Sequence, residues 1–122
     1  VYGERSMTTF EKYSKYENSS LKQETNEHYE SFLIELTNKV KERNSEIIYI
    51  TQISGYGMNK NLYIIANTIL SHCKKYKLNC INLAKNANLN YEDFYDWAHL
   101  NPKGSKKVSD FLIDEFQKLS IN

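Results

Sequence analysis

The sequence predicts an α/β fold in which helices cover a parallel sheet, and three observations support this. Apolar residues recur at helical spacing in three segments, and two short runs that predict strands, the first of them rich in β-branched residues, lie between the helical segments. Elements that alternate in this way are typical of a parallel sheet with helices on its faces. The composition, 40% hydrophobic and 25% charged, is that of an ordinary globular protein, and 122 residues make one domain or a piece of one.

The first half of the chain is predicted to hold one helix and one strand. Residues 7–19 are polar and aromatic without a clear period, so we expect a loop there. Ser20 and Gln23 fit a capping box, which would open a helix that runs to Arg43. Residues 46–53 are a short β-branched run that predicts a buried strand. The apolar face of the helix is expected to consist of Leu21, Tyr29, Phe32, Leu33, Leu36 and Val40.

The second half is predicted to hold two further helices and one strand. After a break at 54–57, apolar residues from Leu62 to Tyr76 mark an amphipathic helix, and residues 78–83 predict a strand. A long loop, 84–100, precedes a final helix with Asn101 as its N-cap and Pro102 at its first position. Its apolar stripe is expected to be Val108, Phe111, Leu112, Phe116 and Leu119.

Two strands are too few for a parallel sheet, because such a sheet is buried on both faces and each inner strand needs neighbours. Val1 and Tyr2 look like the tail of another strand. We therefore expect residues 1–122 to be the C-terminal part of a single domain, whose N-terminal part is absent from this chain.

Charge and cysteine content set limits on partners and location. The formal net charge of +1 provides no field for binding nucleic acid, and no apolar run approaches the length of a membrane span. Cys73 and Cys80 lack the spacing of a metal site, and we expect two buried free thiols in preference to a disulfide. This slightly favours the cytoplasm, although any signal peptide would lie upstream.

Asp96 and His99 are the candidate chemical pair. They lie three residues apart in the loop after the second predicted strand, and ligands of open α/β sheets bind beyond the carboxyl ends of the strands. Asp96 can accept a hydrogen bond from His99 Nδ1–H, which leaves Nε2 as a general base for activating a serine. The alternative is that either residue simply caps the helix or holds the loop. A metal site is a weaker alternative.

The stretch from Asp96 to Gly104, DWAHLNPKG, resembles the last conserved block of the SGNH (GDSL-type) hydrolases. The resemblance implies a flavodoxin-like, three-layer α/β/α fold and a Ser-His-Asp triad without a cofactor or metal. His99 would then be the general base and acid, and Asp96 its orienting partner. It also implies an ester substrate, such as an acylated carbohydrate or a lipid-like ester.

The chain departs from the family pattern in its first blocks. It has no Gly-Asp-Ser sequence, and Ser54 is interpreted as a turn residue. The block that supplies oxyanion donors in the family matches Gly3 but has Arg5 in place of asparagine. Gly3 and Arg5 are therefore candidate oxyanion residues. Trp97, between Asp96 and His99, is a candidate lining residue of an acyl or sugar pocket, and the alternative is that it packs to hold the loop. The fragment alone is expected to be inactive, and the alternatives are a non-catalytic binding domain and an acetyltransferase of the same fold.

Overall fold

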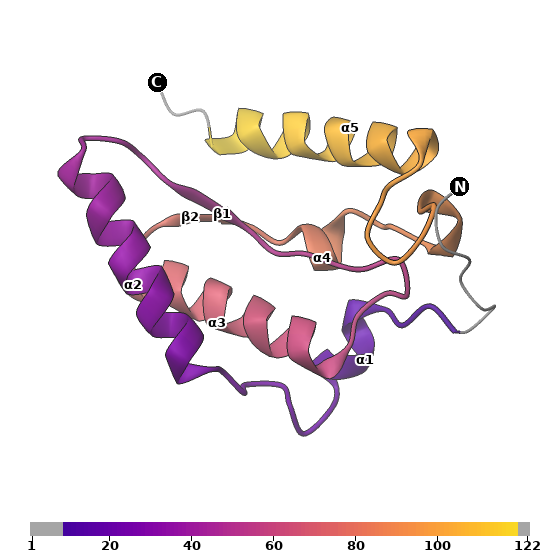
Figure 1. Cartoon of the computed structure of the whole chain (residues 1–122), viewed down its shortest axis with the longest axis horizontal. Coiled ribbons are helices and arrows are strands. Elements are labelled where there is room, and N and C mark those ends of the chain that lie inside the picture. Colours follow the sequence, from indigo (N-terminus) through magenta and orange to yellow (C-terminus); the bar gives the residue numbers. More distant parts are fainter. Residues whose placement is uncertain (1–8, 120–122) are drawn as a thin grey trace.

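The structure is a computed structural model that describes residues 9–119. It has mixed α/β character, with helices on both sides of a pair of strands (Figure 1). The elements in chain order are α1 (Tyr13–Glu17), α2 (Glu27–Glu42), β1 (Ile48–Ile50), α3 (Lys60–Tyr76), β2 (Asn79–Ile81), α4 (Leu83–Asn86), the 3-10 helix η1 (Tyr91–Asp93) and α5 (Pro102–Leu119).

The two strands pair in parallel, as predicted, with Ile48 opposite Asn79 and Ile50 opposite Ile81. Both strands are shorter than the predicted runs, because regular pairing covers three residues of each. Tyr49 packs toward α2 and α3. Ile48 and Ile50 point to the opposite face, since side chains alternate along a strand.

The first long helix begins later than the sequence predicts. The Asn26 side chain accepts a 2.9 Å hydrogen bond from the Tyr29 N–H and caps α2 there, so Ser20 is not the N-cap. The Asn26 N–H also donates to Thr68 Oγ1 on α3, at 2.9 Å. This long-range contact selects the start of the helix. The predicted loop at 7–19 is also partly wrong, because it contains α1, whose Tyr13 is buried in the core.

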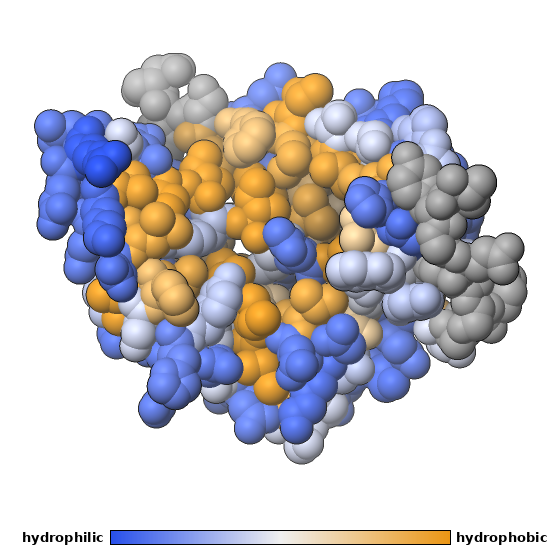
Figure 2. All heavy atoms as spheres, in the orientation of Figure 1, coloured by the Kyte–Doolittle hydropathy of each residue, from blue (hydrophilic) through white to orange (hydrophobic). Residues whose placement is uncertain are grey.

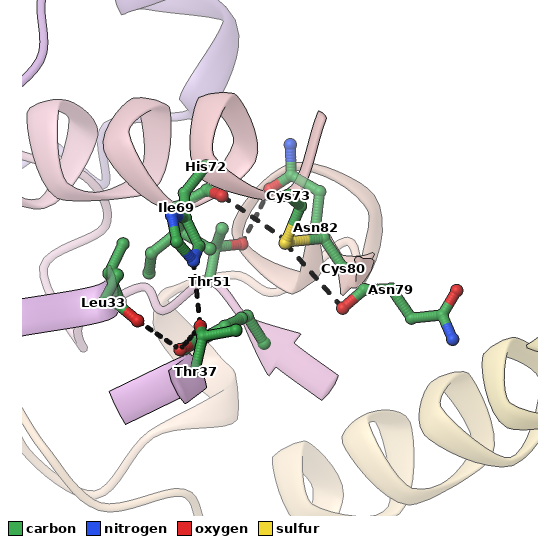
Figure 3. The surroundings of a disulfide bond; sticks show 10 residues. Leu33, Thr37, Thr51, Ile69, His72, Cys73, Asn79, Cys80 and Asn82 are labelled. Atoms are coloured by element: carbon green, nitrogen blue, oxygen red, sulfur yellow. Dashed lines mark hydrogen bonds between the residues drawn. A yellow bond between two sulfur atoms is a disulfide. The ribbon is translucent and has the colours of Figure 1, made fainter. Parts of the chain in front are cut away.

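The prediction of two free thiols is wrong, because Cys73 and Cys80 form a disulfide (Figure 3). The α3 helix ends at Tyr76. Its C-cap, Lys77, is in the left-handed conformation with φ 55° and ψ 47°, and the chain then turns back into β2. The turn brings the two Cα atoms to 6.1 Å, a separation that disulfides commonly span. The preference for a reducing compartment rested on two free thiols and is therefore no longer supported.

A buried polar network lies beside the disulfide (Figure 3). One assignment of hydrogens satisfies every contact: His72 Nε2–H donates to Thr37 Oγ1 (2.9 Å), the Thr37 hydroxyl to Tyr49 Oη (2.8 Å), and the Tyr49 hydroxyl to the Leu33 carbonyl (3.2 Å). Burial lowers the pKa of His72, because a charged imidazole is poorly solvated there. The network joins α2, β1 and α3.

The predicted loop at 84–100 is not wholly irregular, since it contains α4 and η1. The start of α5 agrees with the sequence: Asn101 Oδ1 accepts a 2.9 Å hydrogen bond from the Gly104 N–H, and Pro102 is the first helical residue. Val108 and Phe111 pack against the core cluster that includes Phe94. These contacts fix α5 to the segment that carries the candidate site.

One face of the molecule exposes apolar side chains (Figure 2). β1 pairs with β2 along one edge, and no other strand pairs with it within residues 9–119. Several predicted core residues are exposed in α2 and α5, so the apolar stripes of these helices are only partly covered. The exposed large apolar residues of α2, β1 and α5 are Phe32, Leu36, Ile48, Ile113 and Phe116.

Candidate functional site

The candidate site is a closed loop between η1 and α5. Phe94 and Leu100 form an antiparallel bridge at its base. Inside this bridge, the Tyr95 N–H donates a 2.7 Å hydrogen bond to the His99 carbonyl. The five residues 95–99 are therefore held in a compact turn, of which Asp96 is the second residue and His99 the last.

The Asp96 carboxylate organises this turn. Its Oδ1 accepts hydrogen bonds of 2.8 Å from the backbone N–H groups of Ala98 and His99. The Nδ1 of His99 lies 2.9 Å from both carboxylate oxygens. The contact that the sequence predicts between the two side chains is thus present, and the carboxylate fixes Nδ1 as the protonated ring nitrogen.

The two side chains differ in exposure, as a base and its orienting partner should. Asp96 is buried, with 6% of its surface exposed, whereas 63% of the His99 side chain is accessible. Burial raises the pKa of the Asp96 carboxyl, but the hydrogen bonds from Ala98 and His99 outweigh burial and hold this pKa below its usual range. Asp96 is consequently an anion at neutral pH.

Gly55 connects this turn to the carboxyl end of β1. Its N–H donates a 2.7 Å hydrogen bond to the Trp97 carbonyl. A Cβ atom at Gly55 would lie 1.9 Å from the Asp96 carbonyl oxygen and 2.9 Å from the Trp97 Cα. The close approach therefore requires glycine at this position, and the sequence analysis interpreted this glycine only as part of a strand-ending turn.

Asp93 also holds the site in place, and the sequence analysis did not predict this role. Its carboxylate is fully buried, and Oδ2 accepts 2.8 Å hydrogen bonds from Lys107 Nζ and from the Asn90 N–H. These donors lower the pKa of Asp93 against the opposing effect of burial. Its backbone carbonyl accepts from the Asn101 N–H at 3.0 Å. Asp93 thus ties η1 to α5 next to the candidate pair.

Two grooves lie beside the turn. One, of about 380 Å³, is lined by Tyr56, Asn59 and Trp97, and the other, of about 370 Å³, by Leu89, Phe94, Val108 and their neighbours. Gln52, Ile53 and Ala98 line both. The turn that carries the candidate pair therefore borders space beyond the carboxyl end of β1 through Trp97 and Ala98, and ligands of α/β sheets bind in this region.

The structure describes two of the other residues that the sequence analysis considered for the site, Trp97 and Ser54. Trp97 lies in the turn, with 64% of its surface exposed. Gly3 and Arg5 lie outside the described residues. Ser54 is a turn residue, as predicted: its Oγ donates a 2.7 Å hydrogen bond to the Gly57 carbonyl and accepts one of 3.2 Å from the Tyr56 N–H.

Within the described part of the chain, no group of three or more His, Cys, Asp or Glu side chains is arranged to hold a metal ion. Over the same residues, no helix is both long enough and apolar enough to cross a bilayer. Comparisons of the chain with protein-family models, with curated proteins and with solved structures find no match.

Proposed function

We propose that this chain supplies the histidine base and the aspartate of a Ser-His-Asp ester hydrolase resembling the SGNH class, with a flavodoxin-like sheet in the complete domain. The observation that carries the proposal is the contact of His99 Nδ1 with both Asp96 oxygens at 2.9 Å. With Nδ1–H directed at the carboxylate, Nε2 carries the lone pair that takes a proton. The turn at 95–99 and the glycine at 55 keep this pair in a fixed geometry.

The serine nucleophile comes from polypeptide outside this chain. Two features support this part of the proposal. One edge of β1 has no strand partner among residues 9–119, and the neighbouring α2 and α5 expose large apolar residues. An unpaired parallel strand flanked by exposed apolar surface is expected to be covered by further sheet and helix.

The reaction follows from the roles of the two residues. His99 Nε2 takes the proton of the serine hydroxyl as the oxygen attacks the ester carbonyl, and the imidazolium then gives that proton to the leaving alcohol. Asp96 stabilises the imidazolium. In the second half, His99 takes a proton from water as the water oxygen attacks the acyl-serine. The imidazolium then returns this proton to the serine oxygen as the carbon–oxygen bond to serine breaks and the acid leaves. No metal or organic cofactor takes part.

The test measures hydrolysis of p-nitrophenyl acetate by the complete protein. The variant His99→Ala is expected to lower kcat/KM by about 10³-fold or more, because it removes the proton acceptor. The matched control is His28→Ala, since His28 is exposed on α2 and far from the site in sequence. Full activity after His99→Ala would refute the proposal.

A fluorophosphonate probe, which labels activated serines, separates the enzyme from a non-catalytic binding domain of the same fold. Labelling of the complete protein, and its loss in Asp96→Asn, is the expected result. Absence of labelling in a folded complete protein would favour the binding domain.

A further inference from the structure

The groove beside Trp97 combines side chains from four segments. Gln52 and Ile53 come from the segment that follows β1, and Tyr56 from the turn after it. Asn59 is the N-cap residue of α3, and Trp97 lies in the turn of the candidate site. Trp97 and Ala98, which both line the groove, belong to the same five-residue turn as Asp96 and His99.

The two aromatic residues of this groove are held in place by their backbones. Tyr56 belongs to a turn closed by two hydrogen bonds, from the Ser54 N–H to the Gly57 carbonyl (3.2 Å) and from the Gly57 N–H to the Ser54 carbonyl (2.9 Å). The 2.7 Å hydrogen bond from Gly55 to the Trp97 carbonyl joins this turn to the segment of Trp97. The backbone segments that carry the two aromatic residues are therefore held together before a ligand arrives.

Both aromatic side chains are exposed, at 64% for Trp97 and 39% for Tyr56. Exposed aromatic residues that line one groove present flat apolar surface to a ligand, together with a polar indole N–H and hydroxyl. The amide side chains of Gln52 and Asn59 line the same groove. The Asn59 Oδ1 accepts from the Leu62 N–H at 2.8 Å, which directs the Asn59 amide N–H groups to other acceptors, and Gln52 is exposed.

We propose that this groove binds a sugar ring of a neutral carbohydrate. The C–H face of a pyranose packs on an aromatic ring, and its hydroxyl groups exchange hydrogen bonds with amide side chains. An acyl chain would instead favour an enclosed site lined by apolar residues alone. The inference deepens the proposed function, on which it rests for the reaction, by assigning an acylated carbohydrate as the ester substrate.

Trp97 is the one tryptophan of these 122 residues, so its fluorescence reports on this groove. The experiment titrates the complete protein with chitotriose, with cellotriose and with sodium octanoate, and the variant Trp97→Phe shows which part of the emission change comes from Trp97. We expect a saturable change in Trp97 emission with at least one of the two sugars, at a Kd on the order of 1 mM. No saturable change with either sugar, or a saturable change with octanoate alone, would overturn the proposal.

Two tyrosine variants locate the binding. Tyr56 and Tyr76 are both 39% exposed, but Tyr76 is at the C-terminal end of α3 and does not line the groove. Tyr56→Leu should weaken sugar binding by about fivefold or more, because it removes one stacking surface. Tyr76→Leu should change the Kd by less than about twofold. Equal effects of the two substitutions would show that the sugar binds elsewhere.

This test is independent of catalysis. Sugar binding without ester hydrolysis by the complete protein would reject the hydrolase and retain the groove. Ester hydrolysis without sugar binding would reject the sugar-binding groove and retain the hydrolase.

Discussion

The backbone N–H of Gly55 donates a 2.7 Å hydrogen bond to the carbonyl of Trp97. Through this contact the carboxyl end of β1 meets the turn that holds Asp96 and His99. The space for a side chain at position 55 is already filled by the Asp96 carbonyl, at 1.9 Å from an ideal Cβ. The position of the proposed base relative to the strands therefore depends on one glycine.

Gly55→Ala is expected to move this turn and to lower the free energy of unfolding by about 1–3 kcal/mol, because an added methyl must displace backbone atoms. Urea unfolding followed by Trp97 emission measures the loss, and the emission of the folded variant should also change. Lys103→Ala, an exposed substitution in the first turn of α5, is the control. Unchanged stability and unchanged emission in Gly55→Ala would contradict the predicted displacement.

The Cys73–Cys80 disulfide joins the last turns of α3 to β2. Replacing both cysteines by serine should lower the free energy of unfolding by about 2–3 kcal/mol, which is the loop-closure entropy expected for so short a loop. Dithiothreitol should destabilise the natural protein and leave the double variant unaffected. The prediction fails if iodoacetamide alkylates both cysteines in the folded, unreduced protein.

Acidification should destabilise the protein through His72. Its pKa is lowered in the folded state, so the unfolded chain binds the proton more readily. The stabilisation by neutral His72 is complete above its ordinary pKa of about 6.5 and is lost as the pH falls below that value, by at most about 1.4 kcal/mol per pH unit.

His72→Gln should flatten this part of the stability profile, which urea unfolding between about pH 7.5 and 5.5 measures. The exposed His28 gives a matched control, since His28→Gln should keep the slope. If the stability of His72→Gln fell with pH as steeply as that of the natural protein, His72 would not be the source of the acid destabilisation.

Lys106 and Lys107 offer a comparison between an exposed and a buried ion pair. Lys106 pairs with exposed Asp110, whereas Lys107 pairs with fully buried Asp93, both at 2.8 Å. Lys107→Met should lower the free energy of unfolding by about 2 kcal/mol, because it leaves the Asp93 carboxylate buried without its cation. Lys106→Met should have a much smaller effect on the free energy of unfolding, because water screens an exposed pair. Equal losses of stability in the two variants would contradict the assignment of Lys107 and Asp93 as a buried ion pair.

The lowered pKa of Asp93 gives the Lys107 prediction a pH dependence. A carboxyl with a lowered pKa stabilises the fold above its ordinary pKa, and this contribution is lost as the pH falls through the folded value. The difference in stability between Lys107→Met and the natural protein should therefore shrink in acid, below about pH 4.

The sequence predicted the features whose causes are local. The start of α5 depends on Asn101 and Pro102, which act on the residues directly after them. The contact of Asp96 with His99 needs one turn of chain, so their spacing was sufficient. The parallel pairing followed from the helix between the two strands, because a parallel pair requires such a crossover.

Contacts between distant residues required the tertiary structure. Ser20 and Asn26 both have cap side chains, and the hydrogen bond of Asn26 to Thr68 accompanies the choice of the second. The disulfide depends on a left-handed Lys77, which no pattern in the sequence marks. In the sequence Gly55 resembles an ordinary turn glycine, and only the folded chain places the Asp96 carbonyl against it.

By itself, then, the sequence determined the order of the three long helices and the two strands, and that a carboxylate and an imidazole share one turn. The tertiary structure decided where that turn lies, which charges are buried, and that Tyr56 and Trp97 line one groove. The physical reason is the range of the interactions: propensities, caps and short loops act over a few residues, whereas packing and close backbone approach join segments that only the folded chain brings together.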